Sequence, residues 1–138
     1  MVKDYVGLII ENNKGELLFQ LRDNNPKIKN KNQWSLFGGG IERGETPKQA
    51  AIRELKEELD LAIKKEQLRL LAVFPNYQKK NYLFRLKLNE NTKLKLMEGS
   101  SMGYFTVGEI LRKKNVVKSL RLFLLFYPLI HSVKKENQ

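Results

Sequence analysis

The feature that most constrains the fold is a strand, three consecutive glycines and an acidic helix in immediate succession. Residues 33–37 are typical of a strand, which the three glycines at residues 38–40 should bring to an end. Because glycine has no side chain, the backbone there can come close to a ligand. Thr46 is a good N-cap, Pro47 suits the first helical position and Gln49 completes a capping-box pattern. We therefore expect strand, glycine loop and helix to form one unit.

The helix that begins at Pro47 combines an acidic ridge with an apolar face. Glu54, Glu57 and Glu58 stand at positions i, i+3 and i+4, which places their carboxylates within roughly a 100° arc. Like charges this close repel each other. Mg²⁺ binds oxygen ligands, is often shared with substrate phosphates and would remove the repulsion. A neighbouring arc carries apolar residues that can face a core: Ile52, Leu55 and Leu59.

The same ridge is compatible with an ordinary charged helix surface, on which Arg53 and Lys56 pair with the glutamates. An isolated E-x-x-E-E pattern favours that interpretation. The residues upstream favour a metal site instead, because a glycine-rich strand end and a short loop lead directly into the capped helix.

The spacing of these residues resembles a known family motif. Gly39, five residues, Glu45, seven residues and then residues 53–61 resemble the Nudix box, G-x5-E-x7-R-E-U-x-E-E-x-G-U, where U is aliphatic. Every fixed position of the box, residues 39–61, matches except that Asp60 stands where the family has glycine. Such a glycine suits a left-handed position at a helix end, which Asp tolerates at some cost. We expect the departure to affect local stability more than chemistry.

The resemblance implies roles for the residues of the box. Glu54, Glu57 and Glu58 match the glutamates that bind Mg²⁺, for which Mn²⁺ can substitute, and the carbonyl of Gly38 matches a backbone ligand of some members. Glu57 is also a candidate general base.

Three other residues of the box match positions that support it without reacting: Gly39, Glu45 and Arg53. The resemblance implies that Arg53 forms an ion pair with Glu45 or Glu57.

Several candidates lie outside the box. Glu98 precedes an apolar strand in a glycine-containing loop, where the family often places a further acid, and we expect it to act as a base or additional ligand; the alternative is a surface glutamate. Asn115 lies where MutT-type members read a base. Arg22 could contact a phosphate or could be solvated, and Trp34 could stack on a base, whereas Phe37 suits the core.

The reaction that the resemblance implies is Mg²⁺-dependent attack of water on a phosphoanhydride. The leading substrate is a nucleoside triphosphate, including oxidised ones, cut to the monophosphate and pyrophosphate. Alternatives are nucleotide sugars, dinucleoside polyphosphates and RNA 5′ ends. A non-enzymatic nucleotide sensor or RNA-binding module is a further alternative, although no glutamate of the box is missing. Specificity should lie in residues 23–32 and 89–102.

The rest of the chain predicts one α/β domain over residues 1–138. Strands and helices alternate without a strict βαβ rhythm, which indicates a mixed sheet flanked by helices, a Nudix-type α/β/α sandwich. Strands are expected at residues 5–10, 15–21, 68–74, 82–88 and 102–107, and helices at 108–113 and 116–127.

Composition sets the remaining expectations. The net charge of +11 attracts anions such as nucleotides or RNA, but is also compatible with a merely solvated surface. The absence of cysteine and of a signal-like N-terminus favours the cytoplasm. Residues 120–130 are too short to span a bilayer and predict a buried helix, so no membrane partner is expected. The sequence gives no indication of the oligomeric state.

Overall fold

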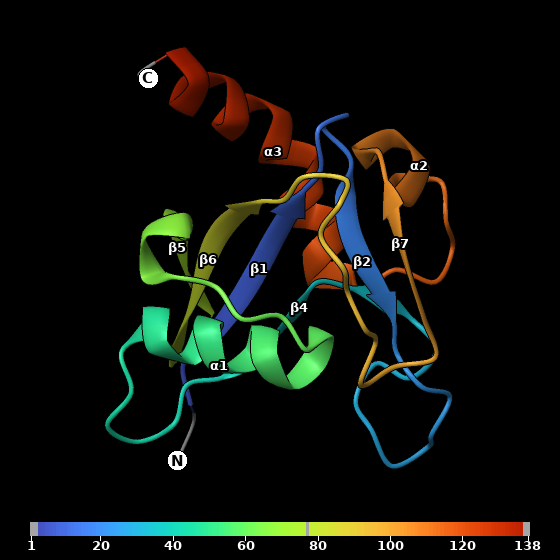
Figure 1. Ribbon diagram of the computed structural model, residues 1–138. Coiled ribbons are helices and arrows are strands. Elements are labelled where there is room, and N and C mark those ends of the chain that lie inside the picture. Colours follow the sequence, from blue (N-terminus) through green and yellow to red (C-terminus); the bar gives the residue numbers. More distant parts are fainter. Residues whose placement is uncertain (1–2, 77, 137–138) are drawn as a thin grey trace.

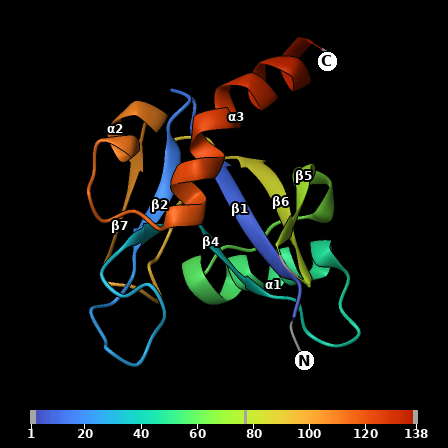
Figure 2. The same cartoon turned by 180° about the vertical axis from the view of Figure 1, so that it is seen from behind.

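Strand β1 (Tyr5–Glu11) lies at the centre of a mixed seven-stranded sheet in a computed structural model that describes residues 3–76 and 78–136. The other elements, in chain order, are β2 (Leu17–Leu21), β3 (Trp34–Ser35), β4 (Phe37–Gly40), α1 (Pro47–Leu59), η1 (Lys65–Gln67), β5 (Arg69–Asn76), β6 (Lys79–Lys87), β7 (Ser101–Phe105), α2 (Val107–Leu111) and α3 (Lys118–Glu136). Helix α1 covers one face of the sheet, and α3 crosses the other (Figures 1 and 2). The predicted sandwich with a mixed sheet is confirmed.

Strands β1 and β2 diverge soon after the turn that joins them. They pair only at Glu11 and Leu17, after which β2 pairs with β7 and β3. The opening is occupied by the chain from Trp34 to Gly40, which pairs first with β2 as β3 and then with β1 as β4. The single strand expected at residues 33–37 is therefore two short strands, because the chain passes from one half of the sheet to the other.

The three glycines do not end a strand, as the sequence suggested, but form most of β4. Gly38, Gly39 and Gly40 pair with Gly7, Val6 and Tyr5 of β1. A Cβ atom on Gly38 would overlap the carbonyl oxygen of Val6, and the φ of Gly38 is +150°, which other residues rarely adopt. Glycine is thus needed here for close packing of the two strands and of the helix above them.

The alternation of β1 divides its side chains between two cores. Val6, Leu8 and Ile10 face α1 and pack with Phe37 and the apolar face of that helix. Ile9 faces the opposite side, in a cluster formed with Phe19, α2 and α3. Phe37 is fully buried. Both faces of the sheet are therefore held by apolar contacts, which fix the position of α1 relative to β4.

Helix α1 begins and ends as its sequence predicts. The Thr46 side chain accepts from the backbone N–H of Gln49, whose own side chain accepts from the backbone N–H of Thr46, so the capping box is complete. Asp60 follows the helix in the left-handed conformation, with φ 51° and ψ 38°. Its side chain lies 2.6 Å from the ammonium of Lys56. The residue that departs from the Nudix box thus takes the conformation expected of the family's glycine.

Helix α3 is longer and less buried than the sequence suggested. It continues past Pro128 to Glu136, since proline removes one helical hydrogen bond without preventing the turns on either side. Leu120, Leu124 and Tyr127 are buried, but Leu122, Leu125 and Phe126 are exposed and follow one outer face. Within the described part of the chain, none of the helices has the length and apolar character needed to cross a bilayer.

Candidate functional site

The acidic face of α1 lies directly against the glycines of β4. The backbone N–H of Gly38 donates to Glu58 Oε2 at 3.0 Å. A Cβ atom on Gly39 would overlap the carboxylate of Glu54. The absence of a side chain at position 39 is therefore what lets the carboxylate of Glu54 lie this close to the strand, which explains why glycines precede the acidic helix in the sequence.

The carboxylates of this group interact unfavourably with one another. Burial, followed by the charges of Glu54 and Glu98, raises the pKa of Glu58 to about 8. Burial also raises the pKa of Glu54, with smaller contributions from the charges of Glu57 and Glu98, although Arg53 opposes the shift. A site that disfavours its own negative charges is suited to a cation.

Arg53 holds the box together. Its guanidinium donates to both carboxylate oxygens of Glu45, at 2.8 and 3.0 Å, and to the carbonyl of Gly40 at 2.9 Å. It also lies 2.9 Å from Glu54 Oε1 and 3.3 Å from Glu57 Oε2. The hydrogen bond from Arg53 lowers the pKa of Glu45. One arginine therefore links the loop, the end of β4 and the acidic ridge.

The loop before β7 brings Glu98 to the box. The backbone N–H of Lys95 donates to the carbonyl of Leu59 at 3.0 Å, and that of Met97 donates to the carbonyl of Glu58 at 2.9 Å. The loop is thereby attached to the last turn of α1. Glu98 itself is exposed, and its charge acts on both Glu54 and Glu58. Four acidic residues of the prediction thus gather in one region.

The oxygen-rich set of Glu54, Glu57, Glu58 and Glu98, with the carbonyl of Gly38, has the chemistry that Mg²⁺ or Mn²⁺ prefers. In residues 3–76 and 78–136, no three acidic, histidine or cysteine side chains already form a coordination shell. Glu57 and Glu98 are exposed beside Glu54 and Glu58, and Glu57 already points toward the ridge through its contact with Arg53 at 3.3 Å. The residues therefore fit a divalent ion that assembles its shell on binding.

A cavity of about 690 Å³, called here the main cavity, reaches the same glycines. Gly38 and Gly39 form part of its wall, and the first turns of α3 lie opposite. Phe74 and Phe126 contribute aromatic walls, and Asn81 contributes a polar group. The basic side chains that line it are Arg22, Lys29 and Lys79. This volume is in the range of sites for nucleotide-sized ligands.

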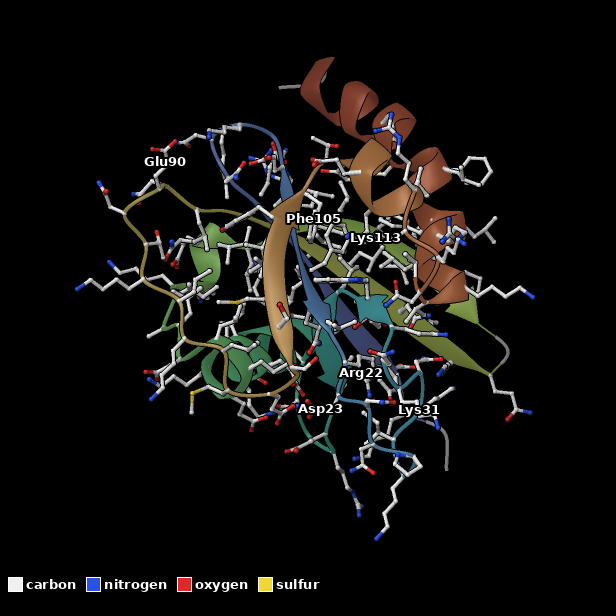
Figure 3. The ribbon with its side chains drawn as sticks, turned by 90° about the vertical axis from the view of Figure 1, so that its right-hand side faces the viewer. Arg22, Asp23, Lys31, Glu90, Phe105 and Lys113 are labelled. Carbon is white, nitrogen blue, oxygen red and sulfur yellow. The ribbon has the colours of Figure 1, made fainter. Side chains whose placement is uncertain are left out.

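Of the three residues predicted to contact the substrate, Arg22 lines the main cavity, whereas Trp34 and Asn115 do not. Arg22 lines the main cavity, and its Nε donates to the carbonyl of Lys29 at 2.9 Å. Trp34 does not line it: its ring meets Phe105 edge-on at 5.1 Å, and the ammonium of Lys113 lies 5.2 Å from the Trp34 ring centre. Figure 3 shows Phe105 and Lys113 close together, away from Arg22.

Asn115 also lies outside the main cavity. The side-chain amide of Asn115 donates to the backbone carbonyl of Asn32 at 3.0 Å, and the backbone carbonyl of Asn115 accepts from the backbone N–H of Trp34 at 2.7 Å. These contacts join the segment before α3 to residues 23–32. A direct contact of Trp34 or Asn115 with substrate stays a prediction without support from the cavity lining.

Comparison with known proteins places this arrangement in a family. The model of the NUDIX domain matches residues 1–125. The chain belongs to the Nudix family. Solved structures with this Nudix fold include a MutT protein from Methanosarcina mazei Go1, with a TM-score of 0.70, 23% identity and coverage of 99% of this chain and 95% of that one. A Nudix hydrolase from M. smegmatis has a TM-score of 0.73 and 17% identity, covering 95% of this chain and 86% of that one.

The curated Nudix relatives match mainly around the box. A protein of Actinobacillus succinogenes named RNA pyrophosphohydrolase is 42% identical over 66 residues, 48% of this chain and 29% of that protein. One of the same name from Nitratiruptor sp. is 36% identical over 74 residues, 54% of this chain and 43% of that protein. The chain thus spans less than half the length of these relatives.

The main cavity contains residues that the sequence did not single out, among them Phe74, Asn81 and Phe126. Phe74 and Asn81 stand in pairing strands, where an alternating pattern predicts only a sheet face. Gln20 was also missed: it is buried, its side-chain amide donates to the carbonyl of Leu36 at 3.2 Å, and its presence beside Glu58 lowers the pKa of that carboxyl. A polar residue within the apolar strand Leu17–Leu21 is the one signal that could have identified it.

Proposed function

We propose that the protein is an enzyme that hydrolyses the phosphoanhydride of a nucleoside triphosphate to the monophosphate and pyrophosphate. The observation that carries the proposal is that Gly38 and Gly39 contact the acidic ridge and also line the main cavity. No carboxylate of the ridge lines the cavity itself, so Gly38 and Gly39 mark the place where a triphosphate whose nucleoside occupies the cavity has to pass to the ridge.

In this proposal Glu54, Glu57, Glu58 and the carbonyl of Gly38 hold Mg²⁺, for which Mn²⁺ can substitute. The bound ion supplies charge neutralisation for the phosphates and a lower pKa for bound water. Glu98 or Glu57 takes the proton of the attacking water, since both carboxylates are exposed beside the ridge. Arg53 and Glu45 keep α1 in place against β4 through the bidentate pair.

The cavity residues position the substrate. Phe74 and Phe126 present apolar surface for a base, and the side chain of Asn81 can exchange hydrogen bonds with its edge. Arg22, Lys29 and Lys79 bring positive charge to the same space and attract the phosphates. In this proposal Trp34 and Asn115 hold residues 23–32 against α3, so we expect them to affect substrate binding only indirectly.

An RNA 5′ end is a second candidate substrate, because a 5′-triphosphate on RNA carries the same anhydride. The named relatives from Actinobacillus succinogenes and Nitratiruptor sp. favour it, although the match covers about half of this chain. The net charge of +11 also favours a polyanion.

The proposed activity is tested by release of pyrophosphate from nucleoside triphosphates with Mg²⁺, with Mn²⁺ and with excess chelator. Glu58→Gln keeps an acceptor for the N–H of Gly38 but loses the charge, so we expect kcat to fall by ~10²–10³ at saturating substrate. Glu66→Gln, an exposed glutamate of η1, is the matched control. Undiminished turnover in chelator, or less than a roughly threefold loss in Glu58→Gln, would refute the proposal.

A further inference from the structure

A second hollow, of about 720 Å³, adjoins the main cavity and is called here the side hollow. Lys29, Asn30, Val117, Ser119 and Leu122 line both spaces. The main cavity also reaches Gly38 and Gly39 beside the acidic ridge, which the side hollow does not. The ridge, the main cavity and the side hollow therefore follow one another in series.

The exposed apolar side chains of the protein are concentrated along these two spaces. Among the residues whose burial the structure describes, five of the eight large ones line the main cavity or the side hollow: Tyr5, Phe74, Leu122, Leu125 and Phe126. Leu125 is 61% exposed and lines only the side hollow. A contiguous exposed apolar surface marks a binding site, whereas apolar side chains that are exposed singly are normal.

The charges around the side hollow are positive. Lys118 and Arg121 line it in addition to Lys29, and no aspartate or glutamate among the described residues lines either space. Arg121 donates to the carbonyls of Leu111 and Lys113, which hold its guanidinium in place. The first turn of α3 adds the positive end of a helix dipole. In Figure 3, Arg22, Asp23 and Lys31 lie together at the loop below α3, and of these three only Arg22 lines the main cavity.

Single-stranded nucleic acid is bound by positive charge along its backbone together with aromatic surface for its bases. Here Phe74 and Phe126 supply the aromatic surface in the main cavity, and the side hollow supplies positive charge and aliphatic surface. We propose that the side hollow is a subsite for the second nucleotide of a 5′-triphosphorylated RNA, with Lys29 and Lys118 contacting the phosphate between the first two nucleotides and Leu125 supporting the second base. This subsite rests on the proposed function, because it requires the triphosphate at the acidic ridge and the first nucleoside in the main cavity.

The serial arrangement separates this substrate from a dinucleoside polyphosphate. In a dinucleoside polyphosphate the two nucleosides lie on opposite sides of the phosphates, so the second pocket should adjoin the acidic ridge. In RNA the second nucleotide is attached to the first nucleoside and points away from the triphosphate. The side hollow adjoins the main cavity and not the ridge glycines, which fits RNA.

The subsite is tested with triphosphorylated substrates of one, two and three nucleotides, written pppN, pppNpN and pppNpNpN. We expect kcat/KM to rise by ~10-fold from pppN to pppNpN and to change little with the third nucleotide. Equal values for pppN and pppNpN would overturn the subsite and leave the proposed function intact. Absence of turnover with every triphosphate would overturn the proposed function, and the subsite with it.

Substitutions test whether the preference for pppNpN over pppN arises in the side hollow. Lys118→Glu places an acid in the first turn of α3, which favours the helix, so a loss of binding is not explained by unfolding. We expect it to abolish most of the preference for pppNpN over pppN. Lys14→Glu, in the exposed turn between β1 and β2, makes the same change in charge away from both hollows. Equal effects of the two variants on this preference would show a general charge effect and overturn the subsite.

Binding of the products gives a readout that does not depend on turnover. Calorimetry with the monophosphorylated products pN and pNpN should show ~10-fold tighter binding of pNpN, which Lys118→Glu removes. The affinity for pNpN should also depend more steeply on salt, by about 0.7 in log–log slope for one additional phosphate contact. The same affinity for pN and pNpN would overturn the subsite, whatever the rates are.

Discussion

At the residue scale, Gly38 and Gly39 require glycine for different reasons, and this difference is testable. A Cβ at position 39 meets the carboxylate of Glu54, the movable end of a flexible side chain, whereas one at position 38 meets the backbone of Val6. Gly39→Ala should therefore keep the fold and lower kcat, by ~10-fold or more, because Glu54 is displaced. Gly38→Ala should lower the melting temperature substantially, because its φ is also unfavourable.

Thermal unfolding and steady-state kinetics of both variants check this contrast. A Gly39→Ala protein with normal turnover would show that the position of Glu54 is not critical. Normal thermal stability of Gly38→Ala would show that β1 and β4 can separate without cost.

Glu98 is the second prediction at the residue scale. If its carboxylate takes a proton from the attacking water, Glu98→Gln should lower kcat and remove or shift an ionisation in the pH–rate profile. Glu90→Gln is the matched control, because Glu90 is an exposed residue of the preceding segment and, unlike Glu98, is not among the charges that raise the pKa of Glu54 and Glu58. A Glu98→Gln profile that overlays the wild type would transfer the role of base to Glu57.

At the element scale, the end of α1 carries a strain that glycine would relieve. Asp60 has φ 51°, which costs less for Asp than for most residues but more than for glycine. Asp60→Gly loses the exposed pair with Lys56, which is worth little. We expect a gain of about 0.5 kcal/mol in the free energy of unfolding, with turnover unchanged.

Asp60→Ala is the control for this effect, since alanine loses the ion pair and still opposes the left-handed conformation; it should destabilise the protein by about 1 kcal/mol. Denaturant unfolding of both variants ranks them. An order in which alanine is as stable as glycine would mean that the conformation of residue 60 does not limit stability.

Some of the helices and strands could be predicted from the sequence and others could not. Helix α1 was predictable to the residue because its cap, proline and capping box are local signals. The passage of residues 33–40 from β2 to β1 was not, because glycines that usually end a strand are used here for close packing, a tertiary effect. Likewise, the sequence predicted a helix that ends at residue 127, whereas α3 continues through Pro128 to Glu136.

At the scale of the whole molecule, the metal ridge was predictable because the motif fixes its spacing, but the main cavity was not. Its walls come from β1, β3, β4, β5, β6, α3 and three residues after β2 (Arg22, Lys29 and Asn30), which meet only when the sheet has formed. Trp34 and Phe74 are both aromatic residues of strands, and nothing local distinguishes the one packed against Phe105 from the one that lines the cavity.

The protonation of Glu58 links the stability of the folded protein to pH and to metal binding. The pKa of Glu58 is raised from an ordinary 4.5 to about 8, so the folded protein binds this proton more tightly than the unfolded chain. The stability from this group is complete below the unfolded value and is lost as the pH rises through about 8. In chelator, wild type should lose stability between pH 5 and 8.5 relative to Glu58→Gln, by on the order of 3 kcal/mol.

Mg²⁺ should reverse this loss, because it replaces the proton as the partner of the ridge. The rise in melting temperature on adding Mg²⁺ should be small at pH 5, where the proton competes, and largest at pH 8.5, and Glu58→Gln should reduce it. Calorimetric melting of both proteins at the two pH values, with chelator and with Mg²⁺, measures all of these differences. If the stabilisation by Mg²⁺ were the same at both pH values, or the same in Glu58→Gln, the ion would bind somewhere other than beside Glu58.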